Sequence, residues 1–69
     1  MSADHETKVA TIQLLSSQAD DLCEVRSRTE ARAEMAPTAE LRTQTLDVVD
    51  ALGGLIRRVA EELVKAASR

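Results

Sequence analysis

Apolar positions along this chain recur at steps of three and four residues, the spacing that keeps side chains on one face of a helix. In the first half of the chain they are Val9, Ile12, Leu15, Ala19, Leu22 and Val25. Residues 26–34 hold no large apolar side chain but keep a high helix propensity. The pattern therefore predicts a first helix over about residues 4–35.

A proline separates the two halves of the pattern. Pro37 cannot continue a helix without losing a backbone hydrogen bond, and it disfavours helical geometry at Ala36. Thr38 has a hydroxyl that can cap a following helix. We therefore predict a turn at residues 36–37 and a second helix over about residues 38–67. Because the connection is so short, the two helices are expected to pack antiparallel.

The second helix carries two apolar rows with alternating steps of three and four. The first row is Leu41, Thr45, Val48, Leu52, Leu55, Val59 and Ala66, with Glu62 as its mismatch. The second row is Leu46, Val49, Gly53, Ile56, Ala60, Leu63 and Ala67. Since neighbouring residues lie about 100° apart around a helix, this helix presents apolar surface in two directions.

A hairpin folded at the proline pairs positions whose numbers sum to about 73, given equal rise along both helices. This predicts four pairs that cover the first row: Val9 with Val64, Leu15 with Val59, Leu22 with Leu52, and Val25 with Val48. The second row would stay exposed, at a cost of roughly 1.5–3 kcal/mol for each large side chain. We therefore predict an all-α antiparallel hairpin that forms a homodimeric four-helix bundle. Its predicted dimer interface is Leu46, Val49, Gly53, Ile56, Ala60 and Leu63.

The pair Gly53-Gly54 has two interpretations. Glycine inside a helix costs about 0.5–1 kcal/mol relative to alanine, so a pair of them calls for compensation. Close approach of another helix at Gly53, with Ala60 further along, would provide it. The alternative is a kink or a break in the second helix.

Composition limits the possible fold and partners. The 69 residues form at most one domain, residues 1–69, with one cysteine and no aromatic residue. A chain this small gains stability from very regular helix packing or from oligomerisation. The net charge of −3, without a basic stripe or aromatic side chains, argues against nucleic acid as a direct partner. The longest apolar runs are far too short to span a membrane, and the N-terminus does not resemble a signal peptide, so a cytoplasmic protein is expected.

Few residues offer chemistry. His5 lies near the terminus, and Cys23 is expected at the edge of the core as a small hydrophobic residue among acidic neighbours. We predict no catalytic residue, no metal site and no cofactor, and hence no enzyme. Arg26, Arg28 and Arg32 are candidate partner-binding residues, because arginine is common at binding hot spots. The alternative for this segment is a solvated helix end.

In length and in its helix–proline–helix layout, the chain resembles the small phage-encoded anti-activators that act early in infection against host proteins. That resemblance implies a helical homodimer that binds and inhibits a host bacterial protein. Targets of that kind are the DNA-binding domain of a LuxR-type quorum-sensing activator and a type IV pilus assembly ATPase.

A second resemblance is to the cytosolic co-chaperones of type III secretion needle subunits, which are also short helical hairpins. It implies that the exposed row of the second helix contacts a larger chaperone and not a second copy. A structural subunit of a helical bundle remains a further alternative.

Overall fold

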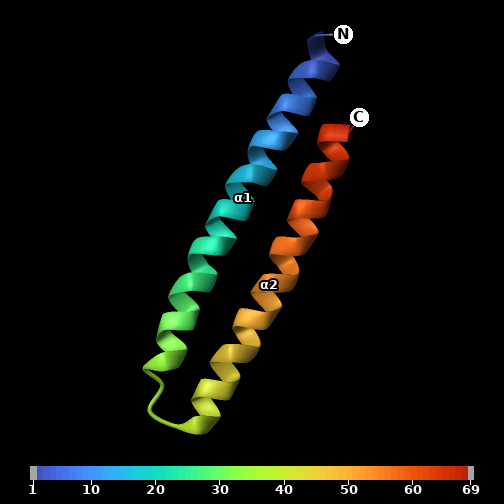
Figure 1. Ribbon diagram of the computed structural model, residues 1–69. Helices are drawn as coiled ribbons and strands as arrows, with labels where there is room; N and C mark the ends of the chain where they lie inside the picture. Colours follow the sequence, from blue (N-terminus) through green and yellow to red (C-terminus); the bar gives the residue numbers. More distant parts are fainter. Residues whose placement is uncertain (1, 69) are drawn as a thin grey trace.

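The computed structural model describes residues 2–68, and they form two helices in antiparallel contact (Figure 1). Helix α1 runs over Ser2–Glu34 and helix α2 over Ala39–Ser68. Both helices begin and end within two residues of the bounds expected from the sequence. The all-helical hairpin is therefore confirmed as the fold.

The connection between the helices is built by local hydrogen bonds. The backbone amides of Met35 and Ala36 donate to the carbonyl oxygens of Arg32 and Ala33 at 3.1 and 3.2 Å, and these tight turns end α1. After Pro37, the amide of Leu41 donates to Thr38 Oγ1 at 3.2 Å. Thr38 is thus the N-cap of α2, as its position after the proline predicted.

The hairpin is long and narrow. It measures 56 × 14 × 10 Å along its principal axes and has a radius of gyration of 16.2 Å. A compact domain of this chain length would have a radius of gyration of about 11 Å. Two helices side by side leave most residues on the outside, so this shape limits how much core the hairpin can form alone.

The line of contact between the helices follows a repeat of alternating steps of three and four. On α1 it consists of Lys8, Ile12, Leu15, Ala19, Leu22, Thr29 and Ala33, with the exposed Arg26 at the remaining position of the repeat. On α2 it consists of Thr45, Val49, Leu52, Ile56, Val59, Leu63 and Ala66. Ser16 and Gly53, which flank this line, are half-buried as well. This is the spacing of a coiled-coil interface, in which each helix inserts side chains between those of the other.

The predicted division of α2 into a covered row and an exposed row is wrong. The contact line runs between the two predicted rows and takes alternate members from each. Val49, which was expected to be exposed, is 6% exposed, whereas Val48, which was expected to be covered, is 51% exposed. Of the predicted pairs, Val9, Val64 and Val25 are exposed as well, while Leu15, Val59, Leu22 and Leu52 are half-buried.

The glycine pair does not break α2, which continues through residues 53 and 54 without a sharp bend (Figure 1). Neither glycine has a positive φ angle. A Cβ atom added at Gly53 or Gly54 would have no atom beyond the local helix within 4 Å. The close approach predicted at Gly53 is therefore not made by α1.

Candidate interaction surfaces

The hairpin has a very small core of its own. Within residues 3–68, the buried side chains are Ala33, at 2% exposure, and Val49, at 6%. No large side chain in this part of the chain is fully buried. The apolar surface that remains outside is therefore the main candidate for function.

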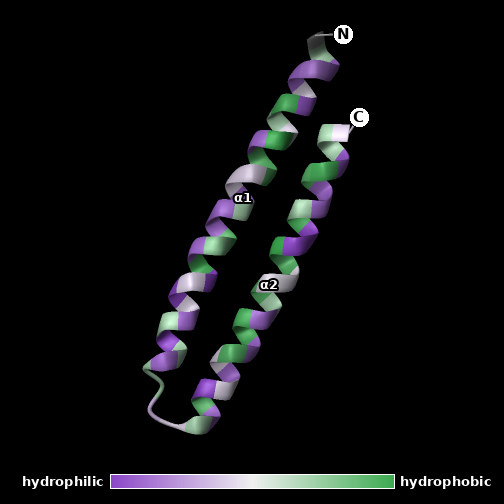
Figure 2. Ribbon diagram, viewed as in Figure 1, coloured by the Kyte–Doolittle hydropathy of each residue, from purple (hydrophilic) through white to green (hydrophobic). Residues whose placement is uncertain are grey.

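Figure 2 shows hydrophobic and hydrophilic residues alternating along both helices, with the end of α1 near the loop mostly hydrophilic. The exposed large apolar residues are Val9, Leu14 and Val25 on α1 and Leu41, Leu46, Val48, Leu55 and Val64 on α2. Leu41, Val48 and Leu55 are 45%, 51% and 45% exposed. They are spaced by seven residues, or two helical turns, so they form one row on one side of the contact line. We call these three residues the outer row.

A second row flanks the contact line on its other side. It consists of Leu46, Gly53, Ala60 and Ala67, again spaced by seven residues, and we call it the small-residue row. Leu46 is exposed, Gly53 is half-buried, and Ala60 and Ala67 are exposed. Apart from Leu46, which is 44% exposed, its members project little beyond the backbone, so another helix could approach closely along residues 53–67.

Three of the six residues predicted for a dimer interface contribute to the hairpin itself. Val49 is buried and Ile56 and Leu63 are half-buried on the contact line with α1, while Gly53 is half-buried beside that line. Leu46 and Ala60 remain exposed. Besides Val9, Val25 and Val64, the exposed residues that sequence analysis assigned to the interior are the three members of the outer row. Their seven-residue spacing was visible in the sequence, but the position of the contact line was not.

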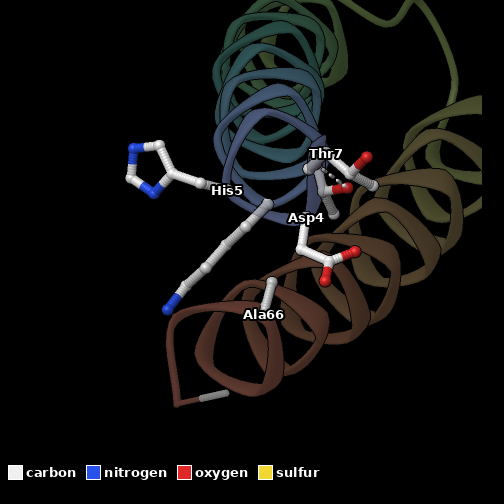
Figure 3. Close-up of a pocket in the computed structure, with 6 residues that line it drawn as sticks. Asp4, His5, Thr7 and Ala66 are labelled. Atoms are coloured by element: carbon white, nitrogen blue, oxygen red, sulfur yellow. Dashed lines mark hydrogen bonds between the residues drawn. The ribbon is translucent and has the colours of Figure 1, made fainter. Parts of the chain in front are cut away.

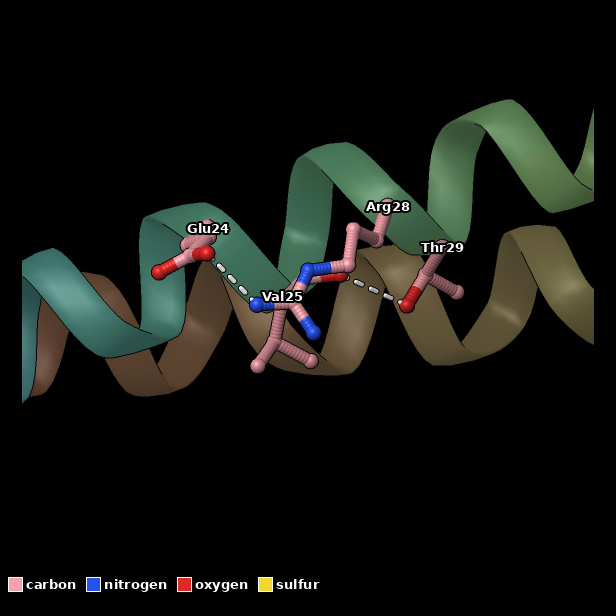
Figure 4. Close-up of polar contacts among 4 residues, drawn as sticks. All are labelled: Glu24, Val25, Arg28 and Thr29. Atoms are coloured by element: carbon pink, nitrogen blue, oxygen red, sulfur yellow. Dashed lines mark hydrogen bonds and ion pairs between the residues drawn. The ribbon is translucent and has the colours of Figure 1, made fainter.

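The three candidate arginines do not form one patch. Residues two apart on a helix point about 200° apart, so Arg26 and Arg28 face different directions. Arg28 Nη2 donates to Glu24 Oε1 at 2.6 Å, as Figure 4 shows beside the bond from Thr29 Oγ1 to the Val25 carbonyl. Arg26 Nε lies 3.5 Å from Glu30 Oε1. Two of the three positive charges are thus matched by carboxylates on α1 itself.

Arg32 differs from the other two arginines. Within the described residues it forms no ion pair, and it lies in the last turn of α1, where a positive charge is favoured by the helix dipole. Arginine is common at such helix ends for this reason alone. Arg32 is exposed, and its charge is the one of the three that no carboxylate in the described residues matches.

A shallow notch lies at the open end of the hairpin, lined by Asp4, His5, Thr7, Lys8 and Thr11 of α1 and by Ala66 of α2. Figure 3 shows the imidazole of His5 pointing away from α2, while Asp4 lies near the last turns of α2. The imidazole of His5 therefore does not face Ala66 across the notch.

Cys23 lies beside the contact line, as expected, but it is not buried there as a small hydrophobic residue, because its side chain is exposed. It follows Leu22, the last large apolar residue of the α1 contact line before the loop, and it points to the side of that line. Within the described residues, no three His, Cys, Asp or Glu side chains are grouped so that they could hold a metal ion. Neither helix, over the described range, is long and apolar enough to cross a membrane.

Comparison of the chain with protein-family models, curated proteins and solved structures finds no match. The surfaces of the hairpin are therefore the basis for a functional proposal.

Proposed function

We propose that this chain is a non-enzymatic interaction protein whose hairpin works as part of a larger helical assembly. The observation that supports the proposal is the contrast between two buried side chains, Ala33 and Val49, and an exposed apolar row on α2. Burying a large apolar side chain stabilises by roughly 1.5–3 kcal/mol, so covering the outer row would add much to the stability of so small a core.

The surface area supports the same proposal. The chain exposes 5430 Å², whereas a compact monomer of 7.5 kDa exposes about 4250 Å². The excess of about 1200 Å² is larger than the roughly 800 Å² that one partner contributes to a standard interface. A single protein–protein contact can therefore bring the chain to an ordinary ratio of surface to mass.

The test is the stability of the isolated chain at high dilution. We expect far-ultraviolet circular dichroism to show helix loss when the chain is diluted well below micromolar concentrations, because too little core remains without a partner. A cooperative unfolding transition that is independent of concentration, with a free energy of unfolding above about 5 kcal/mol, would contradict the proposal.

Our narrower proposal is that the assembly binds and inhibits a host bacterial protein. It is supported by the resemblance in length and layout to phage anti-activators, and it makes a LuxR-type activator and a type IV pilus assembly ATPase the first targets to test. Operator binding by such an activator should weaken when the chain is added. Unchanged operator affinity and unchanged ATPase activity at saturating chain would remove this proposal.

The alternative role as a co-chaperone of a type III secretion needle subunit is favoured by the apolar rows on both sides of the α2 contact line. One row could hold a larger chaperone while the other stays free. Co-expression with a needle chaperone would test it, and a stable complex of the two proteins would be expected. A structural bundle subunit would instead form large assemblies of this chain alone.

A further inference from the structure

The contact line of α2 is made of two interleaved sets of residues, each repeating every seven positions. One set is Thr45, Leu52, Val59 and Ala66, and the other is Val49, Ile56 and Leu63. The outer row lies directly beside the first set, on the side away from the second. It would therefore take the place of the second set if α2 turned about its own axis.

The contact line that such a turn would produce is as regular as the observed one. It keeps the first set and adds Leu41, Val48, Leu55 and Glu62, so its steps also alternate between three and four. Each line contains three large apolar side chains that the other lacks. Each also has one charged mismatch, Glu62 in the alternative line and, one step before Thr45, the exposed Arg42 in the observed line.

The turn of α2 that exchanges the two lines is small. It amounts to about 50°, half the angle between successive residues, and it moves a backbone atom 2.3 Å from the axis by roughly 2 Å. The connection between the helices leaves room for it. Its hydrogen bonds run either within residues 32–36 or within residues 38–42. The side chain of Met35 is 82% exposed, so it does not hold α2 at one angle.

The two ends of the hairpin decide which line is favoured. Positions whose numbers sum to about 74 lie level in this antiparallel pair. Leu63 of the observed line is therefore level with Ile12, whereas Leu41 of the alternative line is level with the much smaller Ala33. The alternative line also brings the carboxylate of Glu62 toward Ile12. The observed line is favoured for both reasons, and Glu62 is the main obstacle to the other.

We propose that α2 rotates about its axis between these two contact lines, so that the hairpin exposes a different apolar row in each state. The observed rotation is the more populated one and exposes the outer row. In the other rotation, α1 itself covers the outer row, and Val49, Ile56 and Leu63 turn outward. The inference goes beyond the proposed function, because it concerns a change within one chain and requires no partner.

The rotation would give binding partners a means of control. A protein that binds the outer row holds the observed rotation, whereas one that binds Val49, Ile56 and Leu63 holds the other, because a ligand shifts an equilibrium by its differential affinity for the two states. Two such partners would weaken each other's binding through α2, even where their surfaces do not overlap.

The experiment compares the reactivity of thiols at two adjacent positions. Cys23, the single cysteine of the chain, is first replaced by serine, and Val48→Cys or Val49→Cys is then introduced separately. The rate of reaction with dithionitrobenzoate is measured at a protein concentration where circular dichroism shows full helicity. Because Val48 is 51% and Val49 6% exposed, the thiol at position 48 should react at least about ten times faster.

Glu62→Leu is the decisive variant, because it removes the mismatch from the alternative line. The thiol at position 49 should then react faster and the thiol at position 48 more slowly. The ratio of the two rates should fall at least about tenfold, since a leucine and not a glutamate now packs against α1 in the alternative rotation. The lost ion pair between Glu62 and Lys65 is exposed, so its loss has little effect.

Glu61→Leu is the matched control. It makes the same change one residue away, at an exposed position on the side of α2 turned away from α1. It should leave the ratio of the two rates within about threefold, because exposed substitutions outside a contact have small effects. Circular dichroism of every variant checks that the helices remain intact.

Three outcomes would overturn the inference. In the first, Glu62→Leu leaves the ratio of the two rates unchanged. In the second, it changes both rates by the same factor, which would reflect the stability of the hairpin and not a rotation. In the third, it slows only the thiol at position 48, which would mean that another chain covers the outer row. None of these removes the proposed function, which fails only if the diluted chain is independently stable.

Discussion

Thr38 Oγ1 accepts a hydrogen bond of 3.2 Å from the backbone amide of Leu41. Thr38, which follows Pro37 directly, is thus both the last residue of the turn and the N-cap of α2. The carbonyl oxygen of Thr38 accepts the amide of Arg42 at 3.0 Å, which is the first bond of the helical type. The cap therefore fixes where α2 starts and, through it, the register of the whole contact line.

Replacing Thr38 by alanine should lower the free energy of unfolding by about 1 kcal/mol, because the amide of Leu41 loses its partner. Urea unfolding at one fixed protein concentration measures the difference. Thr38→Ser should keep most of the stability. Thr43→Ala is the control, because Thr43 is exposed on the same helix and makes no side-chain hydrogen bond within the described residues. Equal losses for both alanine variants would show that the cap contributes nothing.

Two adjacent valines should respond in opposite ways. Val49→Ala should reduce the helicity of the diluted chain, because it removes about 1–2 kcal/mol of apolar burial from the hairpin core. Val48→Ala should leave helicity unchanged or raise it, because Val48 is 51% exposed and alanine is the better helix former. Circular dichroism at equal low concentration compares them. A greater loss for Val48→Ala would place the contact line on the first predicted row.

The glycine pair offers a stabilising substitution. Gly54→Ala should raise the free energy of unfolding by about 0.5–1 kcal/mol, since a Cβ atom there meets nothing within 4 Å and alanine favours the helix. Urea unfolding measures the gain. The reverse change at a nearby exposed position, Ala51→Gly, should lose a similar amount. If Gly54→Ala destabilises the assembled protein while Ala51→Gly behaves as expected, another chain must approach Gly54 closely.

The double change Arg28→Glu and Arg32→Glu should keep the helicity of the chain. It removes one exposed ion pair and places like charges at residues 24 and 28 and at residues 28 and 32, and such exposed pairs contribute only about 0.3–0.5 kcal/mol each. Self-association should also be unchanged, because neither residue lies on α2. If the double variant loses its helicity, or fails to associate, the segment would have a structural role that its ion pairs do not explain.

The sequence predicted the helices and the turn well because their signals are local. Pro37 and Thr38 act within a few residues, and helix propensity is a property of each residue. The face of α2 that meets α1 was not predictable in the same way. Two apolar rows lie side by side on this helix, and both satisfy the steps of three and four. A shift of the contact line by a fraction of a turn decides whether Val48 or Val49 is buried.

The sequence therefore predicted that α2 carries an exposed apolar surface, but it did not predict which residues form that surface. The outer row was assigned to the interior, and part of the interior was assigned to a dimer. The arginine segment was correctly placed at the end of the first helix. Its two intrahelical ion pairs, Arg26 with Glu30 and Glu24 with Arg28, both have the i, i+4 spacing that favours such pairs on a helix.

The hairpin shape also has a kinetic consequence. Contacts near the loop, such as those of Thr29 and Thr45, join residues that are close in the chain, while contacts at the open end join residues near the two termini. Closing the shorter loops costs less entropy, so folding should proceed like a zipper from the loop toward the termini. Unfolding should begin at the open end, and amides there should exchange with solvent first. A partner that binds the middle of α2 would stabilise the central contacts between the helices, while both ends of the hairpin would still open locally.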